Sequence, residues 1–257
     1  MSSKRALITG ASRGIGLALA HVFAREGYDL FLVARSRDEL SEAAARIRSD
    51  YPVDVRVCAI DLTTEGAADK VFQAVAGRVD VLVNNAGVGL FGLFTGTSWE
   101  REEALLQLNV RFLTQLTKLV VADMCARGSG RVLNVSSVAA FLPGPYMSVY
   151  YASKAYVKSF SESLSEEVRS SGVVVSCLCP GPTYSGFAEA AGAQKTGLFS
   201  GDLMTAGEVA EYGYRSLMRG RRVAVPGFRN KVNVFLTKVL PRRLQARIVR
   251  RLSEKKK

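Results

Sequence analysis

Seven short apolar runs, separated by longer stretches with helical spacing, constrain the fold of this chain more than any other feature. The runs lie at 5–10, 29–35, 54–61, 79–87, 130–137, 172–181 and 221–227. Most are continuous rather than alternating, which is typical of strands that are buried on both faces. Strands that alternate with helices predict a parallel sheet with helices on both sides. We therefore expect a single α/β domain with a doubly wound sheet of about seven strands and ligands bound beyond the carboxyl ends of the strands.

The positive charge of the chain is concentrated near its end. The formal net charge is +12, yet residues 219–257 hold 14 Lys and Arg and one acid, Glu254. The preceding residues are therefore close to neutral as a group. This distribution favours a local role for the tail over a basic groove across the fold, so we expect no nucleic-acid partner.

Neither end of the sequence nor its cysteines suggest export or a metal site. The first residues lack the long apolar stretch of a secretory signal, and no run reaches the ~18–20 apolar residues of a membrane-spanning helix. The four cysteines lack zinc-site spacing, so we expect reduced thiols, no metal and a cytoplasmic protein. They are Cys58, Cys125, Cys177 and Cys179.

The segment TGASRGIG (9–16) follows the first apolar run and opens a helical stretch. Gly10 suits a sharp turn, while Gly14 and Gly16 allow close approach of a ligand and close packing of helix on strand. Amide groups at the start of the following helix suit a pyrophosphate. The segment therefore predicts nucleotide binding.

Arginines at two positions suggest which nucleotide is bound. Arg35 ends the second apolar run, where dinucleotide-binding folds meet the adenosine ribose. An acid there would repel a 2′-phosphate, whereas an arginine offers it two donors, and Arg13 could approach from the other side. This favours NADP(H) over NAD(H), with solvated surface cations as the alternative reading of both residues.

Two further runs end in residues that suit the rest of a nucleotide. Asp61 ends the third run and could accept a hydrogen bond from the adenine amino group, or it could instead cap the segment that follows. Small residues in NNAG (84–87), after the fourth run, would let the backbone pass close to a flat ligand.

Taken together and in order, these segments resemble the short-chain dehydrogenase/reductase family. The resemblance runs from about residue 5 to residue 227 and rests on TGASRGIG, VAR, DL, NNAG, NV at 109–110, NVSS ending at Ser137, YYASK and CPGPTYS. It implies a Rossmann-like fold and a proton relay of Asn109, Ser137, Tyr150 and Lys154. It also implies that the cofactor-binding residues are Gly10, Ser12, Arg13, Gly14, Ile15, Gly16, Arg35, Asp61, Leu62, Asn85, Ala86, Gly87, Tyr150, Lys154, Pro180, Gly181, Thr183 and Ser185. Ser185 stands where the family commonly has threonine.

The adjacent tyrosines 150 and 151 raise the question of which one is the acid. Both the i−4 and the i−3 residue of a helix lie near Lys154, so helical geometry leaves almost a tie. The family pattern selects Tyr150, and its usual spacing selects Ser137 over Ser136. Tyr151 is then expected to pack against the sheet or a partner helix.

The resemblance implies an activity. Lys154 should lower the pKa of Tyr150, which then protonates a carbonyl oxygen while NADPH delivers hydride to the carbon. Ser137 should hold the oxygen, Lys154 should bind the nicotinamide ribose, and Asn109 should hold a linking water. We therefore expect an NADPH-dependent carbonyl reductase, or the reverse alcohol dehydrogenase, in a homodimer or homotetramer. The alternative is a catalytically silent nucleotide sensor or scaffold.

The segment 186–206 resembles the variable substrate lid of the family. Its apolar side chains and two residues between the serine and the tyrosine are expected to contact the substrate. They are Phe187, Leu198, Phe199 and Leu203 in the lid, with Phe141 and Tyr146 in the other wall. With no obvious cationic clamp, we expect a hydrophobic ketone or aldehyde.

Beyond a catalytic domain of residues 1–230, the sequence predicts a basic amphipathic extension over 231–257. An apolar residue recurs every four positions at Leu240, Leu244, Ile248 and Leu252, with arginines over most of the other face and Pro241 near the helix start. Such a helix either packs on the domain or a partner subunit, or makes peripheral contact with an anionic membrane.

Overall fold

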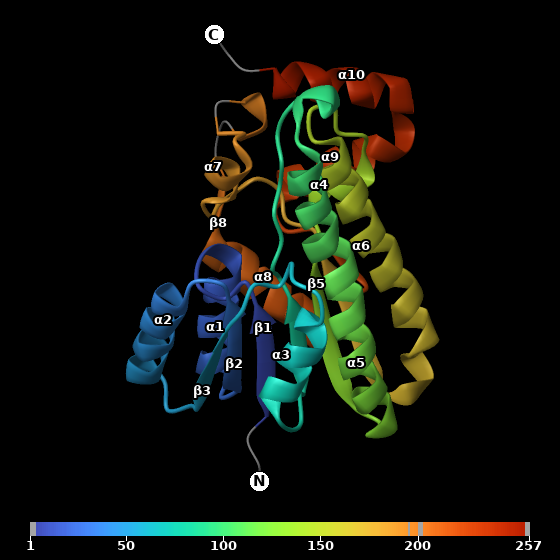
Figure 1. Ribbon diagram of the computed structural model, residues 1–257. Helices are drawn as coiled ribbons and strands as arrows, with labels where there is room; N and C mark the ends of the chain where they lie inside the picture. The colour runs from blue at the N-terminus through green and yellow to red at the C-terminus, as the bar shows by residue number, and fades with distance from the viewer. Residues whose placement is uncertain (1–3, 195, 200–202, 255–257) are drawn as a thin grey trace.

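The computed structural model describes residues 4–194, 196–199 and 203–254, and its centre is a seven-stranded parallel sheet (Figure 1). The strand order is β3-β2-β1-β4-β5-β6-β9. The strands are β1 (Arg5–Thr9), β2 (Asp29–Ala34), β3 (Val55–Ala59), β4 (Val81–Asn84), β5 (Gly130–Val135), β6 (Val173–Leu178) and β9 (Val223–Ala224). The order reverses between β1 and β4, which confirms the doubly wound sheet and fixes the switch point where such folds bind ligands.

Helices cover both faces of this sheet. One layer contains α1 (Gly14–Arg25), α2 (Arg37–Asp50) and α8 (Ala206–Met218), and the other contains α3 (Ala67–Val75), α5 (Leu113–Ala126) and α6 (Ser148–Glu167). Neighbouring strand residues serve opposite layers, since Ile8 is buried in the first core and Leu7 in the second. Burial on both sides explains why the strands read as continuous apolar runs.

The helical region between β4 and β5 is not a continuous α-helix. It consists of α4 (Trp99–Leu106), a π-helical segment η2 (Gln107–Phe112), and α5. Asn109 lies in this π-helical segment and is buried. π-Helical turns inside α-helices are frequently found at functional sites, because the extra residue re-aims a side chain.

Short elements connect β6 to α8 over the predicted lid. They are β7 (Thr183–Tyr184), α7 (Phe187–Ala191), η5 (Gly197–Phe199) and β8 (Met204–Thr205), and β7 pairs with β8. Residues 195 and 200–202 of the lid lie outside the described residues. The remaining short helices are η1 (Phe94–Gly96), η3 (Val138–Phe141) and η4 (Arg169–Ser171).

The predicted extension forms two helices, α9 (Phe228–Val239) and α10 (Arg242–Ser253), at the carboxyl end of the sheet (Figure 1). The boundary expected at residue 230 therefore falls inside α9. Pro241 precedes α10, as its position suggested.

The apolar stripe of the extension is not the face that packs on the domain. Gln245, Val249 and Ser253 are the buried residues of α10. Leu244 and Ile248 are each 42% exposed and Leu252 is 45% exposed. The helix is held in this rotation partly by Gln245, whose Nε2 donates to the backbone oxygens of Thr237 (2.8 Å) and Leu240 (2.7 Å).

Within the described residues, no helix combines the length and apolar character required to cross a bilayer. All four cysteines are free, and the Sγ atoms of Cys177 and Cys179 lie 3.7 Å apart in the core. The two thiols share one face of the strand, as their spacing predicts.

Candidate active site

A cavity of about 1120 Å³ lies beyond the carboxyl ends of the strands. It extends from the glycine loop after β1, past the end of β5 and the start of α6, to the helices α9 and α10. Parallel strands bring all these segments to one edge of the sheet, which is why residues distant in sequence meet there.

The glycine loop is tightly built against the end of β4. Gly10 and Gly14 have φ values of +66° and +58°, which glycine adopts without strain. A Cβ atom on Gly16 would lie 2.1 Å from the backbone oxygen of Gly10, so no side chain fits there. Asn85 Nδ2 donates to the backbone oxygens of Thr9 and Gly10, both at 3.0 Å, and so secures the loop.

The end of the cavity beside the glycine loop carries two arginines and an acid. Arg13 and Arg35 line it, and neither forms a salt bridge in the part of the chain that the structure describes. Asp61 accepts from the backbone nitrogen of Thr63 at 2.9 Å and from its hydroxyl at 2.8 Å. These bonds, the backbone bond above all, lower the pKa of Asp61. Asp61 therefore shapes its own turn while also lining the cavity.

The cavity brings together nearly all the residues expected to bind the cofactor. Its lining includes Gly10, Ser12, Arg13, Gly14, Ile15, Arg35, Asp61, Leu62, Asn85, Ala86, Gly87, Tyr150, Lys154, Pro180, Gly181, Thr183 and Ser185. Gly16 is buried beneath the loop instead, where it allows the close packing described above. The hydroxyls of Thr183 and Ser185 donate to the backbone oxygens of Gly181 (2.9 Å) and Thr183 (3.3 Å).

Ser137 and Tyr150 meet at the centre of the cavity. Ser137 follows β5 and Tyr150 lies in the first turn of α6. The side chain of Ser137 acts to lower the pKa of Tyr150, but burial acts more strongly and raises it. The Ser137 hydroxyl is oriented by the backbone nitrogen of Ala139, which donates to it at 3.1 Å.

Lys154 is buried beside Tyr150, near the end of β5. Its Nζ donates to the backbone oxygen of Val135 at 2.9 Å and lies 5.9 Å from the centre of the Tyr150 ring. The lysine is itself buried, and this lowers its pKa to about 8. Burial is the first cause of both pKa shifts, and it disfavours the charged form of each group.

Asn109 is a positioning residue for the loop after β4. Its Oδ1 accepts from the backbone nitrogen of Val88 at 3.0 Å, and its Nδ2 donates to the backbone oxygen of Val88 at 2.9 Å. A Cβ on Gly87 would lie 3.2 Å from Asn109 Oδ1 and 3.3 Å from Lys154 Nζ. The structure thus gathers Asn109 and Lys154 around one glycine of the cavity wall.

Tyr151 lies against a loop rather than against the sheet or a partner helix. A Cβ on Gly144 would lie 2.1 Å from its ring, so the ring rests on that glycine. It also meets the Tyr150 ring edge-on, with centroids 6.0 Å apart, and lines the cavity. Burial raises the pKa of Tyr151 to about 12.

The expected substrate contacts divide into two groups. Phe187, Leu198 and Phe199 line the cavity, and the Phe187 ring centre lies 5.2 Å from that of Tyr150. Phe141 and Tyr146 are not in its described lining. The ring of Phe141 faces Lys158 Nζ at 5.2 Å, and Tyr146 stacks on Phe91 at 5.7 Å. Tyr146 has a φ of +67°, a left-handed backbone conformation that is uncommon for residues other than glycine.

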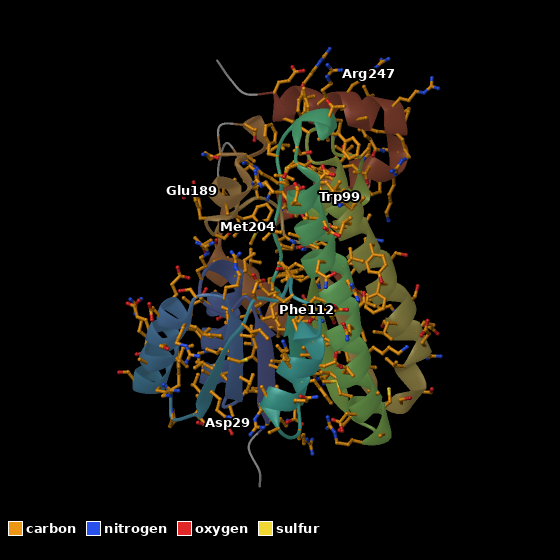
Figure 2. The ribbon with its side chains drawn as sticks, in the orientation of Figure 1. Asp29, Trp99, Phe112, Glu189, Met204 and Arg247 are labelled. Carbon is orange, nitrogen blue, oxygen red and sulfur yellow. The ribbon has the colours of Figure 1, made fainter. Side chains whose placement is uncertain are left out.

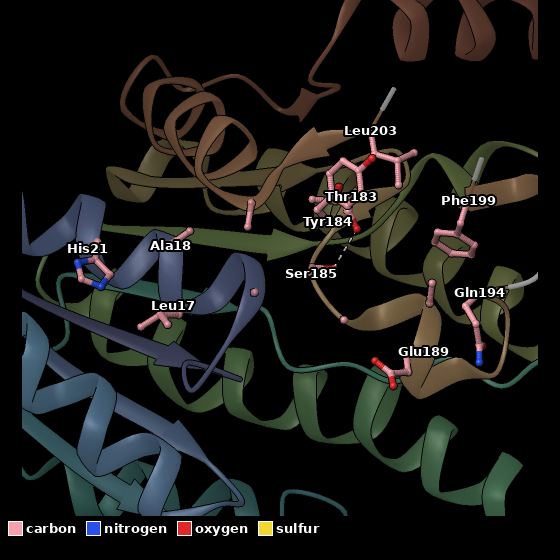
Figure 3. Close-up of a pocket in the computed structure, with 14 residues that line it drawn as sticks. Leu17, Ala18, His21, Thr183, Tyr184, Ser185, Glu189, Gln194, Phe199 and Leu203 are labelled. Atoms are coloured by element: carbon pink, nitrogen blue, oxygen red, sulfur yellow. Dashed lines mark hydrogen bonds between the residues drawn. The ribbon is translucent and has the colours of Figure 1, made fainter. Parts of the chain in front are cut away.

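Leu203 lies in a second, smaller cavity of about 730 Å³ between α1 and the lid (Figure 3). His21 of α1 and Phe199 of the lid also line this cavity. The dashed line in Figure 3 is the bond from Ser185 to Thr183 described above. Leu203 is therefore removed from the reacting groups, because it lies on the outer side of the lid.

Sequence reasoning missed one wall of the large cavity. Leu142, Met147 and several residues of the last two helices line it. The helical residues are Asn230, Asn233, Val234, Leu236, Thr237, Leu240, Gln245, Ile248, Val249 and Leu252. The amphipathic spacing of the tail predicted a helix, but spacing alone does not specify whether that helix packs on the domain, on a partner subunit or on a membrane.

Comparison with known proteins identifies the family. The family model for short chain dehydrogenases matches residues 4–196. The very-long-chain 3-oxoacyl-CoA reductase of Bos taurus is 33% identical over 180 residues, 68% of this chain and 58% of that relative. This chain therefore matches little more than half the length of that curated relative.

Solved structures agree with this result. A short-chain dehydrogenase from Sphingobium yanoikuyae in complex with NADPH has a TM-score of 0.83 and 31% identity, covering 93% of this chain and 96% of its own. One from Burkholderia phymatum in complex with NAD has a TM-score of 0.82 and 26% identity, covering 91% and 92%. With the parallel sheet, the glycine loop and the Ser137–Tyr150 pair, these matches show that the chain belongs to the short-chain dehydrogenase family of oxidoreductases.

Proposed function

We propose that the chain is an NADPH-dependent reductase of a hydrophobic ketone, with a long-chain 3-oxoacyl thioester as the favoured substrate class. The observation that carries this proposal is the position of the Ser137–Tyr150 pair. It lies where the glycine-rich half of the cavity meets the half walled by apolar side chains.

The residues present fit a dinucleotide phosphate. The glycine loop packs closely on the start of α1, as Gly16 shows, and backbone amides at a helix start suit a pyrophosphate. Arg13 and Arg35 offer guanidinium donors at the adenosine end, and a 2′-phosphate is the part of NADPH that such donors would hold. Lys154 and Gly87 would lie beside the nicotinamide ribose.

The proposed catalytic residues of this chain would bind and protonate the substrate oxygen. NADPH, when bound, supplies the hydride that goes to the carbonyl carbon. Ser137 Oγ would donate to the carbonyl oxygen as negative charge develops there. Tyr150 would transfer its phenolic proton to that oxygen, so the ketone gains one hydride and one proton and becomes an alcohol.

The apolar half of the cavity supports the substrate class. Among the described lining residues, the charged side chains other than Lys154 belong to the nucleotide end: Arg13, Arg35, Glu39 and Asp61. Around Phe187, Leu198 and Leu240 the walls suit a hydrocarbon chain, and each buried methylene contributes about 0.8 kcal/mol. The named activity of the Bos taurus relative fits such a chain.

The test is NADPH oxidation by the purified protein with a series of 3-oxoacyl thioesters and ketones, beside two matched variants. We expect Tyr150→Phe to lose at least 100-fold in kcat, in line with the ~10²–10⁴-fold worth of a positioned proton donor, while Tyr151→Phe keeps most of the activity. Collapse in Tyr151→Phe alone would contradict the assignment of the acid. Tight NADPH binding without turnover of any carbonyl compound would favour the second candidate, a nucleotide sensor.

A further inference from the structure

One face of α9 is apolar and exposed. Phe228, Val232, Phe235 and Val239 follow the helical spacing of one stripe and are 80%, 40%, 63% and 62% exposed. A surface helix ordinarily turns such a stripe toward the core. In α9 the stripe faces solvent instead, and no other described part of the chain covers these four large side chains.

The same two helices carry a dense positive charge. Residues 228–253 contain eight Lys and Arg and no acid. Arg243 and Arg247 of α10 are exposed and form no salt bridge within the described residues. Figure 2 shows Arg247 extending away from the molecule at the end where α10 lies. Beside these arginines, Leu244, Ile248 and Leu252 remain nearly half exposed.

A third group of exposed apolar residues lies at this end of the molecule. Leu93 and Phe94 are 63% and 65% exposed, and Trp99, at the start of α4, is 61% exposed. Figure 2 shows Trp99 at the same end of the molecule as α10. Tryptophan and basic residues side by side are typical of surfaces that meet a lipid headgroup layer.

We propose that α9, α10 and the segment 93–99 form a surface that binds anionic lipid bilayers. The apolar side chains enter the boundary between headgroups and acyl chains, and the arginines contact the phosphates. A second copy of the chain fits this surface less well, because a two-fold contact would bring the same eight cations of each copy together without acids to offset them.

This surface also adjoins the active-site cavity. Leu240, Ile248 and Leu252 of the same helices line that cavity, so its outer wall is built from the lipid-binding elements. If the substrate is a long-chain acyl compound, as proposed above, it would reach Tyr150 from the bilayer side. The lipid surface itself does not depend on that activity, and its test requires no turnover.

The test is co-sedimentation of the full-length protein with vesicles of phosphatidylcholine, with and without phosphatidylserine, at low and high salt. We expect binding that requires phosphatidylserine and weakens with salt. Arg243→Glu with Arg247→Glu should reduce the bound fraction about tenfold or more, and Phe235→Ser with Val239→Ser should reduce it comparably. None of these four side chains lines the cavity.

The control is Arg169→Glu with Arg219→Glu, which changes the net charge equally but lies near the amino ends of the strands. These two exposed arginines should leave vesicle binding nearly unchanged. NADPH affinity of each variant, measured in solution, reports whether it is folded. Absence of vesicle binding, or equal loss in the control, would overturn the proposal. A dimer that dissociates in the α9 and α10 variants would do so as well, by assigning the surface to a second copy.

Discussion

At the scale of single residues, burial shifts the pKa values of both Tyr150 and Lys154 away from those in water. Both are buried, and burial disfavours the charged form of each: the pKa of Tyr150 rises and that of Lys154 falls to about 8. The Tyr150 phenol therefore stays protonated at neutral pH and, in this ligand-free site, is a weaker acid than a free phenol. The charged form of the buried lysine, in turn, lowers the free energy of unfolding.

Lys154→Met should therefore stabilise the protein while abolishing its activity. A pKa lowered from 10.5 to about 8 corresponds to a cost of about 3 kcal/mol for the charged form. Losing the bond to Val135 returns part of this, so we expect a net gain of about 1–2 kcal/mol in the free energy of unfolding at pH 7. Urea unfolding measures it.

The pH dependence of that gain identifies its cause. Between pH 8 and 10.5 the unfolded chain keeps the lysine proton that the folded chain releases, so the native protein becomes more stable as pH rises. The advantage of Lys154→Met should shrink over this interval and be constant below it. A pH-independent difference would mean that packing, not charge, separates the two proteins.

Arg35→Asp should move cofactor preference from NADPH toward NADH. The change removes a donor from the adenosine end and adds a charge that repels a 2′-phosphate. We expect the ratio of kcat/KM for NADPH to that for NADH to fall at least tenfold. Arg46→Asp, on the exposed face of α2, is the matched control. An unchanged ratio in Arg35→Asp would remove Arg35 from the cofactor site.

Residues whose roles follow from motif and backbone were predictable, and those set by loop geometry were not. The predicted cofactor-lining positions lie along one cavity, because strand ends in a parallel sheet share an edge. Phe141 and Tyr146 are not in the described lining of that cavity; the ring of Phe141 faces Lys158, and Tyr146 has a positive φ. Neither a cation–π contact nor a left-handed non-glycine residue has a local sequence signal.

At the scale of elements, the glycine loop and α1 act as one unit. The loop carbonyl of Gly10 fills the space that a side chain on Gly16 would need, and Asn85 bonds both ends of the turn. The nucleotide end of the cavity therefore depends on contacts between backbone atoms, which cannot adjust as side chains do.

Gly16→Ala should weaken NADPH binding at least tenfold. Its methyl group would lie 2.1 Å from the Gly10 oxygen, so the loop must move and the amides would no longer converge on the pyrophosphate. Fluorescence titration with NADPH measures the change. Gly207→Ala in α8 is the control, since its nearest neighbour would be Thr205 Oγ1 at 3.9 Å. NADPH binding equal to that of the unchanged protein would refute the packing argument.

The last two helices show where element-level prediction fails. Periodicity located a helix around Leu240–Leu252, and the structure contains helices there, yet the buried face belongs to Gln245, Val249 and Ser253. Hydrophobic spacing assumes that the most apolar face packs on the domain. In α10 the buried face is offset by one residue from the predicted stripe and includes two polar side chains beside Val249, so the assumption misplaced the packing face.

At the scale of the whole molecule, one cavity joins segments from nearly the full length of the chain. Its nucleotide half is built from β1 to β4, and its outer wall from the last 30 or so residues described. The doubly wound parallel sheet was predictable because short apolar runs alternate with helical stretches, and right-handed connections leave few alternatives. The position of α9 and α10 on the cavity was not predictable from the sequence. It depends on contacts between the last helices and the strand ends, and no local pattern encodes such contacts.

The two ends of the described chain lie at opposite ends of the sheet, with β1 starting at one and α10 lying at the other (Figure 1). A fluorescent protein or affinity tag fused to the amino end would thus be separated from the reacting groups by the length of the strands. The same fusion at the carboxyl end would be attached beside the cavity's outer wall. A label at the amino end should therefore leave the cavity open, whereas a label at the carboxyl end could obstruct access to it.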